Sequence, residues 1–191
     1  TSIKPVLAVA VSLLAAAAIL WFNGRANLRD TVSLVAAIVK FLIIISMAPV
    51  VLAGGAVEIT LFNILPGVDF AFRVDSLGMV FATVSSMLWI VAAVYCIGYM
   101  RSLKERSQTR FFASFAVSLS AAVGGAFAAN LFTLVIFYEA LSLVTYPLVY
   151  HKEDKESWDG SRRYLVYLVG ASKSFLLAGL ALTYQMAGTL D

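Results

Sequence analysis

Residues 31–52 read TVSLVAAIVKFLIIISMAPVVL, an apolar run that contains a single charged side chain, Lys40. A helix needs about 20 predominantly apolar residues to cross the roughly 30 Å of hydrocarbon in a bilayer. This run therefore predicts a membrane-spanning helix. The composition of the 191-residue chain agrees, because 61% of its residues are hydrophobic and only 13% are charged, about half the charged share of a soluble domain.

Similar apolar runs occur along the rest of the chain. They cover residues 5–22, 76–99, 111–128, 131–150 and 164–186. We expect an all-α integral membrane protein, one transmembrane domain over residues 1–191 with about six helices. Lys4 before the first run is also typical of a signal peptide, but the run is long and lacks a small-residue cleavage site, which favours a retained helix.

A different pattern separates the second and third predicted helices. Two short runs rich in β-branched and aromatic residues, 58–62 and 70–74, flank Pro66-Gly67. Such runs around a Pro-Gly turn predict a β-hairpin. We expect this short hairpin to lie outside the cytoplasm.

The basic residues of the loops indicate the orientation of the chain. Ten of the fourteen Lys and Arg residues lie in the loops after the first, third and fifth helices: Arg25, Arg29, Arg101, Lys104, Arg106, Arg110, Lys152, Lys155, Arg162 and Arg163. The opposite face has only Lys4 and Arg73. Cytoplasmic loops carry the excess of Lys and Arg, so we expect the N-terminus outside, and six helices return Asp191 to the same side.

Three charged side chains remain inside the predicted helices: Lys40, Glu139 and Lys173. A charge near the bilayer centre costs at least a few kcal/mol, so such residues usually face the bundle interior, pair with one another and mark an ion path. Glu139 lies about 12 Å from the outer end of its helix and Lys173 about 19 Å from the outer end of the next. Because these two helices are neighbours, we expect the two charges to pair.

Other polar residues extend this candidate proton pathway. Helical spacing places Ser142 and Tyr146 on the face of Glu139. His151 follows the same helix at its cytoplasmic end and could exchange protons with water, although an ordinary interfacial side chain explains it too. The alternative for Glu139 is a structural hydrogen bond, for Lys173 a structural counter-ion, and for Lys40 a side chain that snorkels to the interface.

The sequence argues against cofactor and nucleic-acid chemistry in this chain. One histidine and one cysteine do not make an ordinary zinc site, and no Gly-rich phosphate loop or haem-spaced histidine pair is visible. The basic residues are too scattered for a nucleic-acid surface. We therefore expect no cofactor, no metal and no catalytic centre.

Several segments resemble one known family. Residues 130–149 read NLFTLVIFYEALSLVTYPLV, residues 73–79 read RVDSLGM, and residues 97–100 read IGYM. They are similar to the antiporter-like subunits shared by respiratory complex I, Mrp cation/proton antiporters and membrane-bound hydrogenases. The ending LTYQMAGTLD at 182–191 looks most like the D-type Mrp branch. The resemblance covers nearly the whole chain.

The resemblance implies that Glu139 is the proton-pathway glutamate of the fifth helix. Family members have about fourteen helices built around two inverted repeats, and their Glu works with a lysine on a broken seventh helix. This chain corresponds to the early part only, so either it is a fragment or a partner chain supplies the later helices. Lys173 does not belong to the family signature and rests on the burial argument alone.

The leading hypothesis is a proton- or sodium/proton-translocating subunit of a complex-I-like or Mrp-like assembly in the bacterial or archaeal inner membrane. It would associate with other membrane subunits, and the electron-transfer chemistry of an NADH-quinone oxidoreductase would belong to them. One alternative is a membrane subunit for inorganic-carbon (bicarbonate) uptake. Another is a non-transporting structural subunit.

Overall fold

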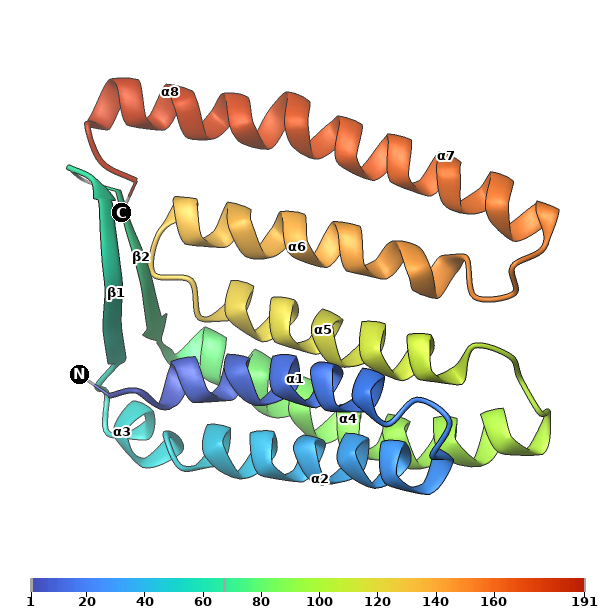
Figure 1. Cartoon of the computed structure of the whole chain (residues 1–191). Helices are drawn as coiled ribbons and strands as arrows, with labels where there is room; N and C mark the ends of the chain where they lie inside the picture. The colour runs from blue at the N-terminus through green and yellow to red at the C-terminus, as the bar shows by residue number, and fades with distance from the viewer. Residues whose placement is uncertain (1, 67, 191) are drawn as a thin grey trace.

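The computed structural model describes residues 2–66 and 68–190. The helices lie side by side, and a two-stranded hairpin crosses one end of them (Figure 1). In chain order the elements are α1 (Lys4–Trp21), α2 (Ala26–Ile45), α3 (Ala48–Leu52), β1 (Val57–Leu65), β2 (Val68–Val74), α4 (Ser76–Ser102), α5 (Gln108–Ala126), α6 (Leu131–Val149), α7 (Lys155–Ala171), the π-helix η1 (Ser172–Leu176) and α8 (Leu177–Ala187).

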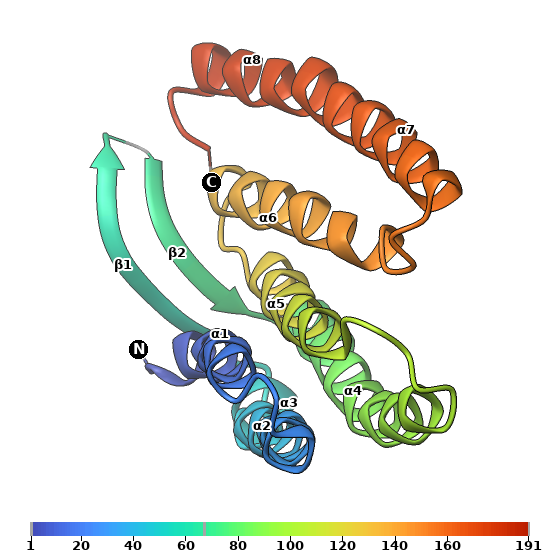
Figure 2. The same ribbon diagram turned by 45° about the vertical axis from the view of Figure 1, so that its right-hand side comes forward.

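Among the described residues, five helical segments are long and apolar enough to cross a membrane. They are α1, α2 with α3, α4, α6, and α7 through α8. The sixth helix, α5, is less apolar. It packs against α1, α4 and α6 and lies between α6 and α1 (Figure 2), so its neighbours shield it from lipid. The expected fold, six helices with a hairpin between the second and third, is confirmed.

Two helices begin at least five residues before the apolar runs that predict them. The second begins at Ala26 rather than at residue 31, and the last begins at Lys155 rather than at residue 164. At Lys155 the reason is a capping box, in which Asp154 accepts the backbone N–H of Ser157 and the Ser157 hydroxyl accepts the N–H of Asp154. Hydropathy marks where lipid begins, whereas a cap marks where the helix begins.

The hairpin fixes the position of α6. β1 and β2 pair antiparallel from Val57↔Val74 onward; of the predicted Pro66-Gly67 turn, Gly67 lies outside the described residues. The N–H of Arg73 donates to the Phe127 carbonyl over 2.7 Å. Asn130 donates to the Asp69 carbonyl over 2.7 Å and accepts the Thr133 N–H over 2.9 Å, which caps α6. The start of the Glu139 helix is therefore attached to the sheet.

Gly78→Ala tests the close contact between α4 and α5. A Cβ at Gly78 would lie 2.5 Å from the backbone oxygen of Ala126, so one helix would have to move. Overpacking of this kind costs about 1–3 kcal/mol, and we expect a lower melting temperature. Gly98→Ala, in the same helix but with nothing within 4 Å, is the control and should be neutral or stabilising. Equal effects at the two glycines would contradict this account.

Candidate functional site

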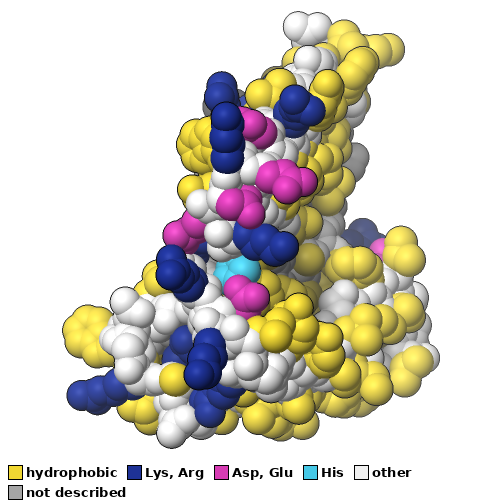
Figure 3. Space-filling view, turned by 90° about the vertical axis from the view of Figure 1, so that its right-hand side faces the viewer, with side chains coloured by type: hydrophobic (Ala, Val, Ile, Leu, Met, Phe, Trp, Pro, Cys, Tyr) yellow, Lys and Arg dark blue, Asp and Glu magenta, His cyan; other side chains and the backbone are white. Residues whose placement is uncertain are grey.

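Charged side chains gather at the end of the molecule opposite the hairpin. Figure 3 views this end and shows Lys, Arg, Asp and Glu around the single histidine. We call it the basic-loop end; it carries the connections 22–25, 103–107 and 150–154. The other end, with β1 and β2, is called the hairpin end. The charges inside the helices lie between these two ends.

Glu139 and Lys173 are in direct contact, as their depths predict. Nζ of Lys173 lies 3.4 Å from Oε2 of Glu139, and the side chains are 54% and 15% exposed, respectively, in the isolated chain. The other carboxylate oxygen, Oε1, is buried and has no hydrogen-bond partner among the described residues. One oxygen of the carboxylate is thus ion-paired, and the other is buried without a partner among the described residues.

A π-helical turn carries Lys173. Its five residues, Ser172–Leu176, interrupt the long last helix between α7 and α8. A π-turn bonds residue i to i+5 and so takes one residue more than an α-turn. This extra residue rotates the faces of α7 and α8 relative to each other. Such turns recur at functional sites, and here the turn presents the lysine to α6.

In the described part of the chain, the two polar residues expected beside Glu139 contact other residues. The hydroxyl of Ser142 donates to the Tyr138 carbonyl over 2.9 Å, and Tyr146 stacks on Tyr150 with ring centroids 6.3 Å apart. A contact that the sequence did not indicate joins α6 to α7 instead. The hydroxyls of Thr145 and Tyr164 lie 2.9 Å apart.

Lys40 does not snorkel, so that alternative is wrong. Its side chain is fully buried, and Nζ donates to Oγ of Ser12 over 2.7 Å and to the Leu119 carbonyl over 2.8 Å. Nζ also lies 5.6 Å from the ring centroid of Trp89. The reason is helical position, because Lys40 shares the buried face of α2 with residues such as Ser33 and Ala37. Lys40 therefore sits apart from Glu139, on the other side of α5.

His151 lies in the loop after α6, twelve positions beyond Glu139 and so about 18 Å from it along the helix axis. Its ring packs edge-on against Phe111, with centroids 5.4 Å apart. Nε2 is 3.9 Å from Oε2 of Glu105, and both ring nitrogens are buried without a hydrogen-bond partner in the part of the chain that is described. The structure thus places His151 with the basic-loop end and away from the Glu139–Lys173 pair.

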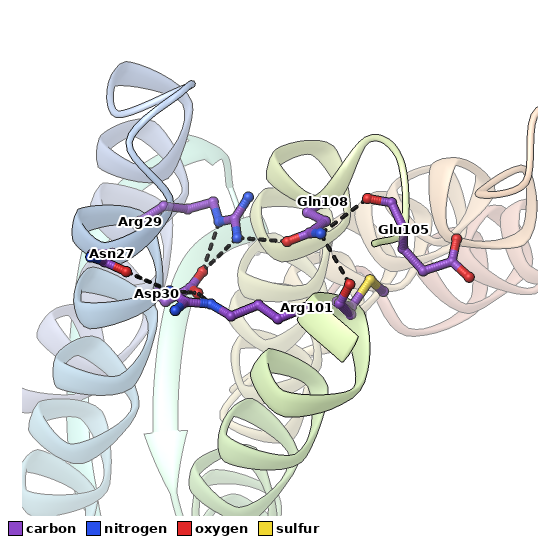
Figure 4. Close-up of polar contacts among 7 residues, drawn as sticks. Asn27, Arg29, Asp30, Arg101, Glu105 and Gln108 are labelled. Carbon is purple, nitrogen blue, oxygen red and sulfur yellow. Dashed lines mark hydrogen bonds and ion pairs between the residues drawn. The ribbon is translucent and has the colours of Figure 1, made fainter. Parts of the chain in front are cut away.

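The structure contains a buried ionic cluster near the basic-loop end that the sequence did not lead us to expect. Asp30 is held by Arg29 at 2.8 Å and by Arg101 at 2.5 Å. Gln108 accepts from Arg29 and donates to the carbonyls of Met100, near the end of α4, and of Glu105, in the loop that follows (Figure 4). The cluster escaped prediction because Arg29 falls before the apolar run and reads as a loop residue. An Arg next to an Asp at the edge of an apolar run was the available signal.

The loops at this end are held by a second ionic contact. Nη1 of Arg110 lies 2.7 Å from Oε1 of Glu153, and the Ser107 hydroxyl donates to the same oxygen over 2.6 Å. The Ser107 hydrogen bond first, and the Arg110 charge second, lower the pKa of Glu153. The ionised carboxylate therefore joins the loop before α5 to the loop after α6.

Glu153→Gln tests that contact through pH. A carboxyl whose pKa is lowered on folding adds stability that is present above its unfolded pKa, about 4.3, and is lost as the pH falls through the folded pKa. We expect the wild-type protein to lose more stability than Glu153→Gln as the pH falls from about 5 to 3. Thermal melts across that range measure the difference. Parallel curves would show that the ionised carboxylate contributes nothing to stability.

Two models of known families match the chain. "NADH-Ubiquinone oxidoreductase (complex I), chain 5 N-terminus" matches residues 66–112, and "NADH:quinone oxidoreductase/Mrp antiporter, TM" matches residues 128–191. Together they cover most of the chain from the hairpin turn onward. The match includes the α6 helix of Glu139 and the π-turn of Lys173.

Curated relatives resemble most of the chain, over 62% to 97% of its length, and are much longer. The A/B component of a probable K⁺/H⁺ antiporter from Rhizobium meliloti is 27% identical over 91% of this chain, which is 16% of that protein. The D component of the Na⁺/H⁺ antiporter from Alkalihalophilus pseudofirmus is 26% identical over 97% of this chain and 37% of its own length. The chloroplastic NAD(P)H-quinone oxidoreductase subunit 2 of Chlorokybus atmophyticus is 34% identical over 62% of this chain and 23% of its own length.

Two solved structures share the fold over the full chain. A chain of the archaeal membrane-bound sulfane sulfur reductase superposes with a TM-score of 0.85 at 21% identity, and 39% of that chain is covered. A chain of the Mrp complex from Dietzia sp. DQ12-45-1b superposes with a TM-score of 0.82 at 22% identity, and 36% is covered. Both matched chains are parts of multisubunit membrane complexes.

Proposed function

The chain belongs to the family of membrane subunits that NADH:quinone oxidoreductase and the Mrp antiporters share, and on this premise we propose that it moves protons, alone or in exchange for sodium, within a multisubunit assembly. Glu139 is the proton carrier of this proposal. The observation that carries it is a carboxylate within a membrane-spanning helix that has one oxygen on a lysine and the other without a partner among the described residues.

The pair suits a proton that is bound and then released. Burial favours the neutral carboxyl, whereas a nearby ammonium group favours the ionised form. With Nζ of Lys173 3.4 Å from the carboxylate, a small movement of the π-turn changes the balance between these two effects. Rearrangement of neighbouring subunits would supply that movement, so the bound proton is exchanged when the pair opens or closes.

The pair also argues for partners beside α6 and the π-turn. Lys173 is half exposed in the isolated chain, and a charged side chain at this depth normally faces a bundle interior or a water-filled cavity. Additional helices, from another subunit or from further sequence, would provide that cover. The relatives are long enough to contain them, since this chain spans between 16% and 37% of their lengths in the two antiporter proteins compared.

We place the protein in the bacterial or archaeal inner membrane, with the basic-loop end in the cytoplasm and the N-terminus outside. The start of α1 and the end of α8 both lie at the hairpin end (Figure 1), which agrees with an even number of crossings. The excess of Lys and Arg at the opposite end supports the direction. Cysteine labelling at Gly54 and at Gly160, from opposite sides of sealed vesicles, would test the placement.

The transport proposal is tested in vesicles that contain the complete assembly. Proton movement is followed with a pH-sensitive dye, and the wild type is compared with Glu139→Gln. A carrier role requires loss of transport with the assembly intact. Loss of assembly with normal flux per assembled complex would instead identify a structural subunit.

A further inference from the structure

Lys40 occupies a polar site inside the apolar core that is separate from the Glu139–Lys173 pair. It projects from α2 into the space between α1, α4 and α5, and its side chain is fully buried. α5 lies between this region and α6 (Figure 2). The transport proposal for Glu139 uses none of these groups.

No carboxylate pairs with the Lys40 amine in the described part of the chain. The other charged or titratable side chains on the four helices are Lys4, Arg29, Asp30, Tyr95, Cys96, Tyr99, Arg101 and Arg110. In the described part of the chain, the side-chain and carbonyl partners of Nζ are instead Ser12 and Leu119. Asp30, the one acid among them, is ten positions away on α2, about 15 Å along the axis, and is paired with Arg29 and Arg101. A buried charge normally has a partner of opposite charge, whereas the described surroundings of this amine supply two oxygen acceptors and an aromatic ring.

The atoms around Nζ accommodate both protonation states of the amine. A neutral amine has two N–H groups, and two acceptors are present, the Ser12 hydroxyl and the Leu119 carbonyl, at 2.7 and 2.8 Å. The third N–H of the ammonium form can face the Trp89 ring, 5.6 Å from Nζ, where a cation is attracted to the π-system. A proton can therefore be added or removed without rearrangement of the helices.

Two further polar atoms extend the site. Nε1 of Trp89 and Oγ of Ser33 belong to side chains that are only 1% exposed, and neither has a hydrogen-bond partner within the described ranges. Buried polar atoms are nearly always satisfied, so such exceptions point to a bound molecule or to a functional role. Ser33 lies on the buried face of α2 between Asp30 and Lys40, with Ala36 and Ala37 as the small residues between.

From these contacts we infer that Lys40 is a second proton-binding site, located in the core formed by α1, α2, α4 and α5. The amine binds a proton as an ammonium held by Ser12, Leu119 and Trp89, and releases it to leave a neutral amine on the two oxygen acceptors. Ser33 and Asp30 lie on the same buried face of α2 as Lys40, and they lead from Lys40 toward the basic-loop end. This binding site does not depend on whether Glu139 carries protons.

The test compares thermal stability with pH for the purified protein and for Lys40→Met. In the unfolded chain the lysine stays charged from pH 5 to 9, so wild-type stability rises with pH only where the folded site has released its proton. We subtract the melting temperature of the wild type from that of Lys40→Met. This difference should be constant at the acid end and should then fall by about 3 °C or more toward pH 9, because the wild type gains stability there. Lys152→Met, at an exposed loop lysine, is the control and should show a constant difference.

A second variant tests the inference even if Lys40→Met does not fold. Ser12→Asp supplies the missing carboxylate next to Nζ and should lock the amine in its charged form, so stability loses its rise toward pH 9. Two results would overturn the inference. If the difference in melting temperature between Lys40→Met and wild type is constant from pH 5 to 9, the lysine is charged throughout. If the difference changes evenly across the whole range, the amine is neutral throughout. Neither result depends on transport, so the proposal for Glu139 would stand or fall separately.

Discussion

Glu139→Gln is expected to lower proton transport by about 100-fold or more while the protein still assembles. A positioned proton-transfer group contributes about 10²–10⁴-fold to a rate. The glutamine amide has nearly the same shape as the carboxyl group but neither binds nor releases a proton near neutral pH. The substitution also removes a partly buried charge, which on its own is not destabilising when the partner is half exposed, as Lys173 is. The measurement is the initial rate of dye-reported proton movement per assembled complex in vesicles.

Glu58→Gln is the matched control for this experiment. Glu58 is also a carboxylate with a basic partner, since it lies 3.2 Å from Arg73, but both side chains are more than half exposed on the hairpin. We expect transport by this variant to equal that of the wild type. Wild-type transport by Glu139→Gln would refute the carrier role, and a shared loss in both variants would mean that the assay reports carboxylate number rather than position.

Lys173→Met is expected to slow transport about tenfold and to move its pH profile. Without the ammonium group 3.4 Å away, the ionised carboxylate loses its main stabilising neighbour. The balance that the pair is proposed to switch is then absent, so the dependence of transport on pH should change. The measurement is transport rate against the pH of the receiving compartment, for which a tenfold change in rate is well resolved.

Lys173→Arg separates charge from geometry in the same assay. It keeps the positive charge and should retain the wild-type pH profile, although the planar guanidinium changes the rate. Lys155→Met, at the start of the same helix, should leave both unchanged. A Lys173→Met protein with normal flux and lowered stability would show that Lys173 is only a structural counter-ion to Glu139.

The sequence was sufficient for the fold and for one contact of the site. Apolar runs and loop charges reflect the cost of lipid exposure, which acts on each helix separately, so six helices and a hairpin follow without knowledge of packing. The Glu139–Lys173 contact also follows, because neighbouring antiparallel helices leave two charges of similar depth with few other partners.

What the sequence could not supply depends on the direction of side chains between helices. Lys40 has the spacing of a snorkelling residue, and only the packing of α1, α4 and α5 around it turns it inward. The π-turn at Ser172–Leu176 has no composition that distinguishes it from an α-turn. In the Arg29–Asp30–Arg101 cluster, the adjacent Arg29 and Asp30 are visible in the sequence, but their partner Arg101 is more than seventy positions away and no local pattern indicates it.

The two ends of the molecule respond differently to the surrounding solution. At the hairpin end the elements are joined largely by backbone hydrogen bonds, among them Arg73 to Phe127 and Leu131 to Leu190, which neither titrate nor weaken much in salt. At the basic-loop end the joining contacts are ionic, and the one between Arg110 and Glu153 is exposed enough to be screened. The exposed Glu58–Arg73 pair at the hairpin end is screened too, but the backbone hydrogen bonds of β1 and β2 join the same two strands. Ionic strength and acidity therefore act mainly on the basic-loop end. The helices are therefore held at the hairpin end by contacts that the solution hardly changes, whereas the contacts at the basic-loop end, which faces the cytoplasm in the proposed orientation, vary with salt and pH.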